Sequence, residues 1–263
     1  DISAVRPAEG FAIARAAAER ALEIDDQLAE AHTSRGFLYT FAGWNWDAAE
    51  ESYRRAMSLN PGYATAHQWY AELMVIQGRF DDALASARRA HELDPLAFIM
   101  GTTIGDALFF ARRYDEAIAQ LRATVELEPS FPPAHSDLGR SLVQSAQYEE
   151  GIEEFRIAAR LAGGNLKTSA GLAHALALSG RPDEARAILA NMMERLPTGL
   201  VSPHAVAIVH IALGELGPAM DWLERAYRER DRALVWAKVH PRLDPMRSDP
   251  RFQAILTGMG LAS

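Results

Sequence analysis

Residues 61–95, PGYATAHQWYAELMVIQGRFDDALASARRAHELDP, contain two segments with apolar residues at helical spacing, 64–77 and 80–93. Gly78 separates the two segments, and Asp94-Pro95 closes the second, so each segment is followed by residues that end a helix. The stretch therefore predicts one hairpin of two amphipathic helices.

The layout of this hairpin recurs at a step of 34 residues. The prolines that keep this step, one of them after a skipped place, are Pro61, Pro95, Pro129 and Pro197. Small residues at the expected crossing point of the second helix are Ala49, Ala83, Ala117, Gly151, Ala185 and Ala219. Small residues at the same point of the first helix are Gly36, Ala71, Gly105, Gly139, Ala173 and Ala207. Only a small side chain lets two helix backbones approach closely, so the pattern predicts a row of such hairpins.

A helix–turn–helix unit repeated every 34 residues is the signature of the tetratricopeptide repeat, and residues 15–230 resemble the tetratricopeptide repeat (TPR) family. The resemblance implies an all-α fold, a right-handed α-solenoid of stacked helix pairs. The units that it implies are residues 1–28 (a truncated repeat with its second helix only), 29–63, 64–97, 98–131, 132–165, 166–199 and 200–231, followed by a C-terminal capping segment with a short helix at 232–263. We expect this segment to cover the open apolar end of the stack.

The array contains one single-residue insertion, which lies within residues 43–47. We expect the inserted residue in the turn between the two helices of its repeat, where no core register is lost.

Composition narrows the function classes. The formal net charge of −8 argues against nucleic-acid binding through this region, because nonspecific binding depends on clustered lysine and arginine. The chain has no cysteine, which excludes disulfides and thiol chemistry. No apolar run reaches the roughly 18–20 residues that a membrane span needs. We expect a cytoplasmic protein that does not interact with membranes.

Two residue patterns invite a catalytic or metal-binding interpretation. Paired acids recur at 81–82, 115–116, 149–150 and 183–184, each in the predicted first turn of a second helix, where negative charge offsets the helix dipole. His32, His67 and His135 are equivalent residues of three repeats, so they would lie about 10 Å apart, too far to share a metal ion. We expect the acids to offset the helix dipole, and we expect packing or partner contact from the histidines. No catalytic residue, cofactor or metal is predicted, and we expect no enzyme.

A binding surface follows from the resemblance. In TPR proteins the first helices line the concave face, and five places of each repeat contact ligands. Carried over to this chain, the predicted groove residues are Phe37, Phe41, Glu72, Ile76, Asp106, Phe109, Phe110, Arg140 and His174. Aromatic side chains exposed on a groove are costly unless something covers them. We therefore expect a protein or peptide ligand; the alternative is that the aromatics pack within the repeats or against a missing N-terminal part.

The groove does not resemble that of the chaperone-binding TPR proteins. Those proteins hold a C-terminal carboxylate with a lysine at the fifth place and an asparagine at the ninth, whereas this chain has, for example, Thr33 with Phe37 and Gln68 with Glu72. The carboxylate clamp is absent. A ligand with apolar side chains and a basic group near Glu72 and Asp106 fits better.

A narrower resemblance concerns the protein as a whole. Residues 44–47, 60–71 and 234–256 resemble the C-terminal TPR regions of multidomain bacterial signalling regulators, in which a DNA-binding, cyclase or kinase domain precedes the repeats. The first predicted helix also lacks its partner, because Pro7 would break it. Both features imply a domain upstream of Asp1.

The predicted function is that of a non-catalytic scaffold that binds a protein or peptide in its groove. Two alternatives from other classes stay open at this point: a module that senses a small molecule in a closed pocket, and a module that drives homodimerisation.

Overall fold

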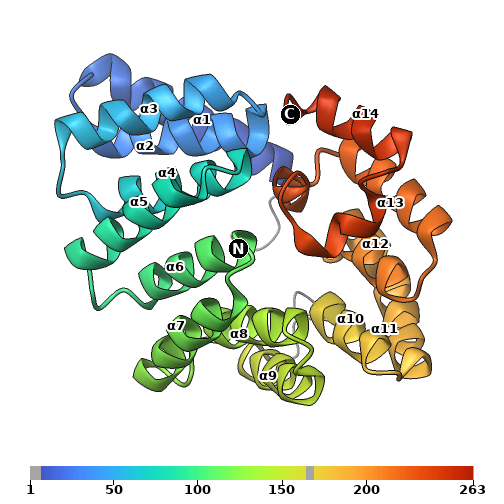
Figure 1. Ribbon diagram of the computed structural model, residues 1–263. Helices are drawn as coiled ribbons and strands as arrows, with labels where there is room; N and C mark the ends of the chain where they lie inside the picture. Colours follow the sequence, from blue (N-terminus) through green and yellow to red (C-terminus); the bar gives the residue numbers. More distant parts are fainter. Residues whose placement is uncertain (1–6, 164–168, 263) are drawn as a thin grey trace.

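The computed structural model describes residues 7–163 and 169–262, and all the regular structure in these ranges is helical (Figure 1). The first helices of the successive pairs are α2 (Ala29–Leu38), α4 (Ala64–Gln77), α6 (Phe98–Phe110), α8 (Pro132–Gln144), α10 (Ser169–Leu178) and α12 (Pro203–Ala212). The second helices are α1 (Pro7–Ile24), with which the described residues begin, α3 (Trp46–Leu59), α5 (Phe80–Leu93), α7 (Tyr114–Leu127), α9 (Tyr148–Leu161), α11 (Pro182–Arg195) and α13 (Leu216–Arg228). The predicted all-α solenoid of sequential helix pairs is confirmed.

The hairpin predicted from residues 61–95 is formed by α4 and α5. Four of the first helices begin where the sequence analysis begins a unit, at Ala29, Ala64, Phe98 and Pro132. The unit boundary predicted between residues 165 and 166, and the start of the truncated repeat, lie outside the described residues.

Each hairpin turns on a residue in the left-handed backbone conformation. Gly78, Gly180 and Gly214 have φ values of 81°, 82° and 75° at this place. Two equivalent turns are formed by Arg112 and Ala146, with φ of 61° and 59°. A residue with a side chain costs roughly 1–2 kcal/mol in this conformation, so packing of the flanking helices enforces both turns.

The small residues at the helix crossings are required by close contact between the two helices of a pair. A Cβ atom on Gly36 would lie 2.6 Å from the ring of Tyr53, and a Cβ atom on Gly105 would lie 2.6 Å from Leu121. Such distances are shorter than any van der Waals contact. The crossing pattern read from the sequence is therefore confirmed at these two positions.

We expected the single-residue insertion to lie in a turn. The structure accommodates it at the end of a helix instead. Residues Tyr39–Gly43 form a π-helix that continues α2, and Trp44 follows in the left-handed conformation with φ of 52°. A π-helix holds one extra residue per turn without breaking the helix. Asn45 then caps α3 by accepting a hydrogen bond from the backbone N–H of Ala48 at 3.2 Å. The insertion thus widens the end of the first helix.

The helix pairs follow one another around an arc, and the last pair faces the first (Figure 1). The rings of Trp44 and Tyr227 stack with their centroids 5.7 Å apart. The indole N–H of Trp46 donates a hydrogen bond to the backbone carbonyl of Met259 at 2.8 Å. Arg230 donates to the carbonyl of Ala42 at 3.3 Å. These contacts join the two ends of the array into a closed ring.

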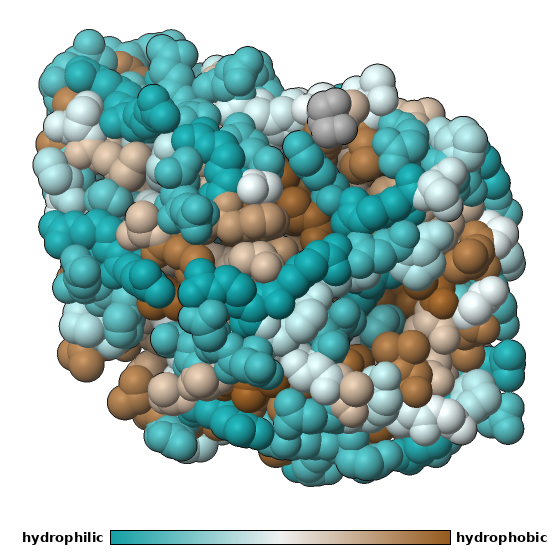
Figure 2. Space-filling model, in the orientation of Figure 1, coloured by the Kyte–Doolittle hydropathy of each residue, from teal (hydrophilic) through white to brown (hydrophobic). Residues whose placement is uncertain are grey.

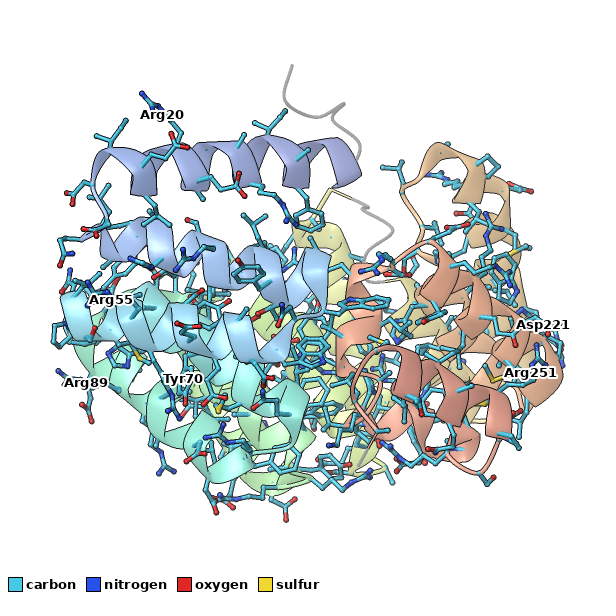
Figure 3. The ribbon with its side chains drawn as sticks, turned by 90° about the horizontal axis from the view of Figure 1, so that it is seen from above. Arg20, Arg55, Tyr70, Arg89, Asp221 and Arg251 are labelled. Atoms are coloured by element: carbon cyan, nitrogen blue, oxygen red, sulfur yellow. The ribbon has the colours of Figure 1, made fainter. Side chains whose placement is uncertain are left out.

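The C-terminal segment, residues 232–262, was expected to cap the last repeat, but it extends much further. It consists of two 3₁₀ helices, η5 (Arg232–Trp236) and η6 (Pro241–Met246), and of α14 (Pro250–Gly258). Helix α14 packs on α13, where Arg251 points toward Asp221 and donates a hydrogen bond to it at 2.7 Å (Figure 3). Helix η5 contacts α4, α12 and the π-helix that follows α2, and η6 contacts α12 and α13. They cover the inner face, by which we mean the surface formed by the first helices.

The face of the molecule seen in Figure 2 is mainly hydrophilic, with apolar residues near its middle and along parts of its edge. Among the described residues, the helices are too short or too polar to cross a membrane.

Substitution of Gly36 tests the close crossing. We expect Gly36→Ala to lower the free energy of unfolding by about 1–3 kcal/mol, because the added methyl group overlaps the buried Tyr53 ring. Gly217→Ala on α13 is the matched control: a Cβ atom there has no neighbour within 4 Å, and the change should raise stability by about 0.4–1 kcal/mol. Urea titration of both variants measures the difference; equal effects would contradict the crossing argument.

Candidate functional site

The predicted groove residues lie on the inner face, but most of them are not exposed. Phe41, Ile76, Phe109 and Phe110 are between 0% and 3% exposed. The C-terminal segment covers them, with Trp236 packed 5.8 Å from Phe41 and 6.3 Å from Phe110 between ring centroids. The expectation that these four side chains are open to a partner is therefore wrong, because the chain itself supplies the apolar cover that they require.

The remaining groove aromatic, Phe37, is half-buried among the rings of Phe11, Phe41 and Trp69. The guanidinium of Arg232 lies over Phe37 and Phe41, 5.2 Å and 4.6 Å from their centroids. This cation–π arrangement comes from the C-terminal segment and not from a bound partner. The aromatics pack partly within the repeats, as the alternative proposed, and partly against the C-terminal segment, which neither expectation included.

The charged groove residues are brought together at the centre of the inner face. Arg140 on α8 donates hydrogen bonds to Asp106 on α6 and to Asp137, its neighbour on α8, the second at 3.1 Å. The Arg140 guanidinium also lies 4.2 Å above the ring of Phe109. The basic group that we expected from a ligand near Glu72 and Asp106 is supplied by the chain, through Arg140 and Arg232.

Burial of these carboxyl groups changes their protonation. The pKa of Glu72 is raised to about 7, first by burial and then by the charge of Asp106, while Arg232 opposes the rise. The pKa of Asp137 is raised to about 8 by burial and by Asp106, against the opposing charges of Arg140 and Arg242. Near neutral pH the cluster thus holds carboxyl groups that retain a proton.

Three histidines complete the cluster. His174 on α10, which we predicted as a groove residue, is 3% exposed and does not open onto a groove. His204 on α12 lies 6.1 Å from His240 of the C-terminal segment, measured between ring centroids. Burial and the nearby charge of Arg242 lower the pKa of His174 and His240 well below the ordinary value. All three rings are therefore neutral at neutral pH.

Part of this region is hollow. A cavity of about 470 Å³ lies between α8, α10, α12 and the C-terminal segment. Its apolar wall includes Phe110, Phe155, Met192, Ile208 and Trp236. Its polar wall includes Asp106, Asp137, Arg140, His204, His240 and Arg242. Leu200 on its rim is 66% exposed. A volume of this size matches a small organic molecule or a few side chains of a partner.

Several buried side-chain nitrogen atoms in this region have no hydrogen-bond partner among the described residues. In Arg242, Nε and Nη2 are buried without a partner, and the same holds for Nε of Arg140 and Nε2 of His204. Burial and the charge of Arg140 lower the pKa of Arg242 to about 9. Buried polar groups in proteins are nearly always hydrogen-bonded, so this concentration of free donors is a property of the site.

Sequence reasoning missed Asp137, His204, His240 and Arg242 as site residues. Asp137 has a detectable signal, because it precedes the predicted groove residue Arg140 by three residues on one helix face. His240 and Arg242 belong to the C-terminal segment, which does not follow the 34-residue repeat. The repeat pattern therefore assigns neither residue a position in the groove.

The equivalent histidines have a structural role that the repeat explains. The Nε2 atoms of His32, His67 and His135 lie 2.9, 3.1 and 2.9 Å from the carbonyl oxygens of the residues six positions earlier, Asp26, Pro61 and Pro129. Each contact joins the imidazole ring to the backbone of the turn that precedes its repeat. The predicted packing role of these histidines is confirmed. Within residues 7–163 and 169–262, no group of three or more histidine, aspartate or glutamate side chains is arranged to hold a metal ion.

The acid pairs lie in the first turns of α5, α7, α9 and α11, as predicted. There Arg79, Arg113 and Arg181 at the N-caps also donate to the acids three residues later. The pairs therefore lie where negative charge offsets the helix dipole, as expected.

Comparison with known proteins identifies the repeat. Tetratricopeptide repeat models match residues 45–96, 102–165 and 136–198, which together make up more than half of the chain. No curated protein matches the chain in sequence.

Solved structures with a similar arrangement of helices include three TPR-like proteins at low sequence identity. The type IV pilus biogenesis factor PilW is 22% identical with a TM-score of 0.61, over 71% of this chain and 86% of that one. PilF of Pseudomonas aeruginosa is 18% identical with a TM-score of 0.56, over 72% and 85%. The APC/C hetero-tetramer Cut9–Hcn1 is 17% identical with a TM-score of 0.65, over 95% of this chain and 46% of that one. Such identities show a shared fold and no more.

The raised carboxyl pKa values predict how stability depends on pH. The stability that Glu72 and Asp137 contribute is fully present below their unfolded pKa, near 4, and is lost as pH rises through about 7 and 8. The buried histidines act in the opposite direction, but only below about pH 6.5. Between pH 6.5 and 8.5 the melting temperature should therefore fall by a few degrees.

Two variants isolate the carboxyl contribution. Asp137→Asn should flatten the fall in melting temperature, since its amide does not ionise. Asp183→Asn is the control, because that side chain is 99% exposed and should leave the slope unchanged. If the melting temperature of Asp137→Asn falls with pH as steeply as that of the wild type, the Asp137 carboxyl group does not cause the fall.

Proposed function

Because the chain belongs to the tetratricopeptide repeat proteins, helical scaffolds that usually bind other proteins and do no chemistry, we propose that it is a non-catalytic protein-interaction scaffold. The binding site that we propose is the opening between α8, α10 and α12, together with the cavity behind it. The observation that carries this assignment is the division of the inner face: the C-terminal segment fills most of it but leaves this cavity hollow.

The cavity suits a partner for two physical reasons. Its apolar wall, which includes Phe155 and Ile208, gains free energy when an apolar side chain replaces water. Its polar wall includes buried nitrogen atoms that have no partner among the described residues, so a partner can hydrogen-bond to them without displacing another group of the protein. The exposed Leu200 on the rim extends the apolar surface outward.

The predicted groove residues divide into two groups under this proposal. Asp106, Phe110 and Arg140 line the cavity and are proposed to contact the partner. The others hold the C-terminal segment or the core in place; they are Phe37, Phe41, Glu72, Ile76, Phe109 and His174.

A small-molecule sensor is the second candidate, because the cavity volume of about 470 Å³ is typical of sites for small organic ligands. The matches above do not bear on the resemblance to bacterial signalling regulators, on homodimerisation or on a cytoplasmic location, and these stay predictions.

Site-specific crosslinking tests the scaffold proposal. A photoreactive phenylalanine derivative at position 200 should capture a partner protein in the cells of origin. The same residue at position 127 is the matched control, because Leu127 is 68% exposed but belongs to α7, away from the cavity. We expect an adduct from position 200 only, and we expect Ala205→Trp, which fills the cavity, to abolish it.

Equal adducts from both positions would contradict the assignment, as would capture that persists in the Ala205→Trp variant.

A further inference from the structure

The geometry of the cavity points to the chemistry of its ligand. We propose that the cavity binds a carboxylate group carried on an apolar body, with the carboxylate held by Arg242 and His204. The inference rests on the proposed binding site and names the group that enters it.

Arg242 is the residue that requires such a group. A guanidinium can only donate hydrogen bonds, and no described residue accepts one from its side chain: Nε and Nη2 are buried and unpaired. His204 is 7% exposed, lines the same cavity and has an unpaired Nε2. An acceptor with two oxygens can take hydrogen bonds from Arg242 and also from His204 in the tautomer that carries its proton on Nε2. A carboxylate presents two oxygens to a guanidinium in matching geometry.

The charge balance favours an anion of single charge. The positive charge of Arg140 is paired with Asp106, and Asp137 accepts a further hydrogen bond from it, whereas Arg242 has no ion-pair partner within 4 Å among the described residues. An unpaired buried charge is costly, and one ligand carboxylate would compensate for it. Asp137 lies near the cavity but retains its proton near neutral pH, so its carboxyl group does not repel the ligand.

A phosphate group fits this site less well. It would bring close to two charges into a cavity that offers one unpaired guanidinium and also contains the ionisable Asp106.

The apolar wall specifies the rest of the ligand. Phe155, Met192 and Ile208 line the cavity, and the guanidinium carbon of Arg242 lies 6.0 Å from the ring centroid of Phe155. An aryl or branched aliphatic group next to the carboxylate would fill this space. Such a group can belong to a free organic acid or to an acidic residue flanked by apolar residues in a partner protein.

The structure also predicts how substitution of Arg242 affects the melting temperature of the ligand-free protein. If its charge serves only the ligand, Arg242→Met removes an uncompensated charge and should not lower the melting temperature. A structural arginine would behave in the opposite way, because its removal would break existing contacts.

Thermal unfolding with simple probes tests the inference. We expect sodium phenylacetate to raise the melting temperature by about 5 °C at roughly 100 times its Kd. Phenylacetamide, which has the same shape without the charge, and inorganic phosphate should have no such effect. The peptide acetyl-Leu-Asp-Phe-amide and its Asn counterpart show whether the carboxylate belongs to a protein or to a free acid. If only the Asp peptide raises the melting temperature, the carboxylate belongs to a partner protein. If only phenylacetate raises it, the ligand is a free acid.

Three variants identify the residues. Arg242→Met should abolish the response to the carboxylate probes, and His204→Phe should weaken it about tenfold in Kd, which provides a second reading if the first variant does not fold. Arg112→Met is the control. Arg112 pairs with Asp244 of the C-terminal segment, outside the cavity, so the rise in melting temperature with the carboxylate probes should be unchanged.

The inference is overturned if neither carboxylate probe raises the melting temperature, if the amide probes are as effective, or if Arg242→Met and His204→Phe respond like the wild type. Crosslinking from position 200 does not depend on a carboxylate, so it can succeed while this inference fails.

Discussion

Packing of the C-terminal segment against the inner face is the contact on which the rest of the structure depends. A curved array of helix pairs presents its first helices on one side, and in this chain that side carries phenylalanine and isoleucine residues that water would penalise. Leu234, Val235 and Leu243 of the segment are fully buried against them. The segment therefore takes the position that a ligand occupies in an open groove.

The same packing creates the unusual electrostatics of the interior. Once the segment covers the inner face, Glu72, Asp106, Asp137 and Arg140 lose most of their contact with water, and Arg242 is brought in with the segment. Charges that would be ordinary on an open groove become a network with raised carboxyl and lowered histidine pKa values. The candidate site is thus a product of the cover as much as of the repeats.

The repeats could be predicted from the sequence because their signals are local. Periodic glycine and alanine residues mark the helix crossings, and Gly78 marks a turn through its left-handed backbone. The course of the C-terminal segment could not be predicted, since it departs from the period and its partners, such as Phe41 for Trp236, are distant in sequence. The predicted groove residues lie on the first helices and the π-helix after α2, but their burial depends on the C-terminal segment. The π-helix at Tyr39–Gly43 was missed for another reason: an insertion fits equally well in a turn or at a helix end, and periodicity does not choose between them.

The seam between the first and last helix pairs changes how the molecule must fold. In an open solenoid each repeat depends only on its neighbours, so the terminal repeats fray and folding spreads from any point. Here the hydrogen bond from Trp46 to Met259 links residues 213 positions apart, and neither end can detach without losing it. Contacts of such long range raise the entropic barrier to folding and slow it. A linear array can fold one repeat after another. The ring instead closes late in folding, in one cooperative step that joins its two ends.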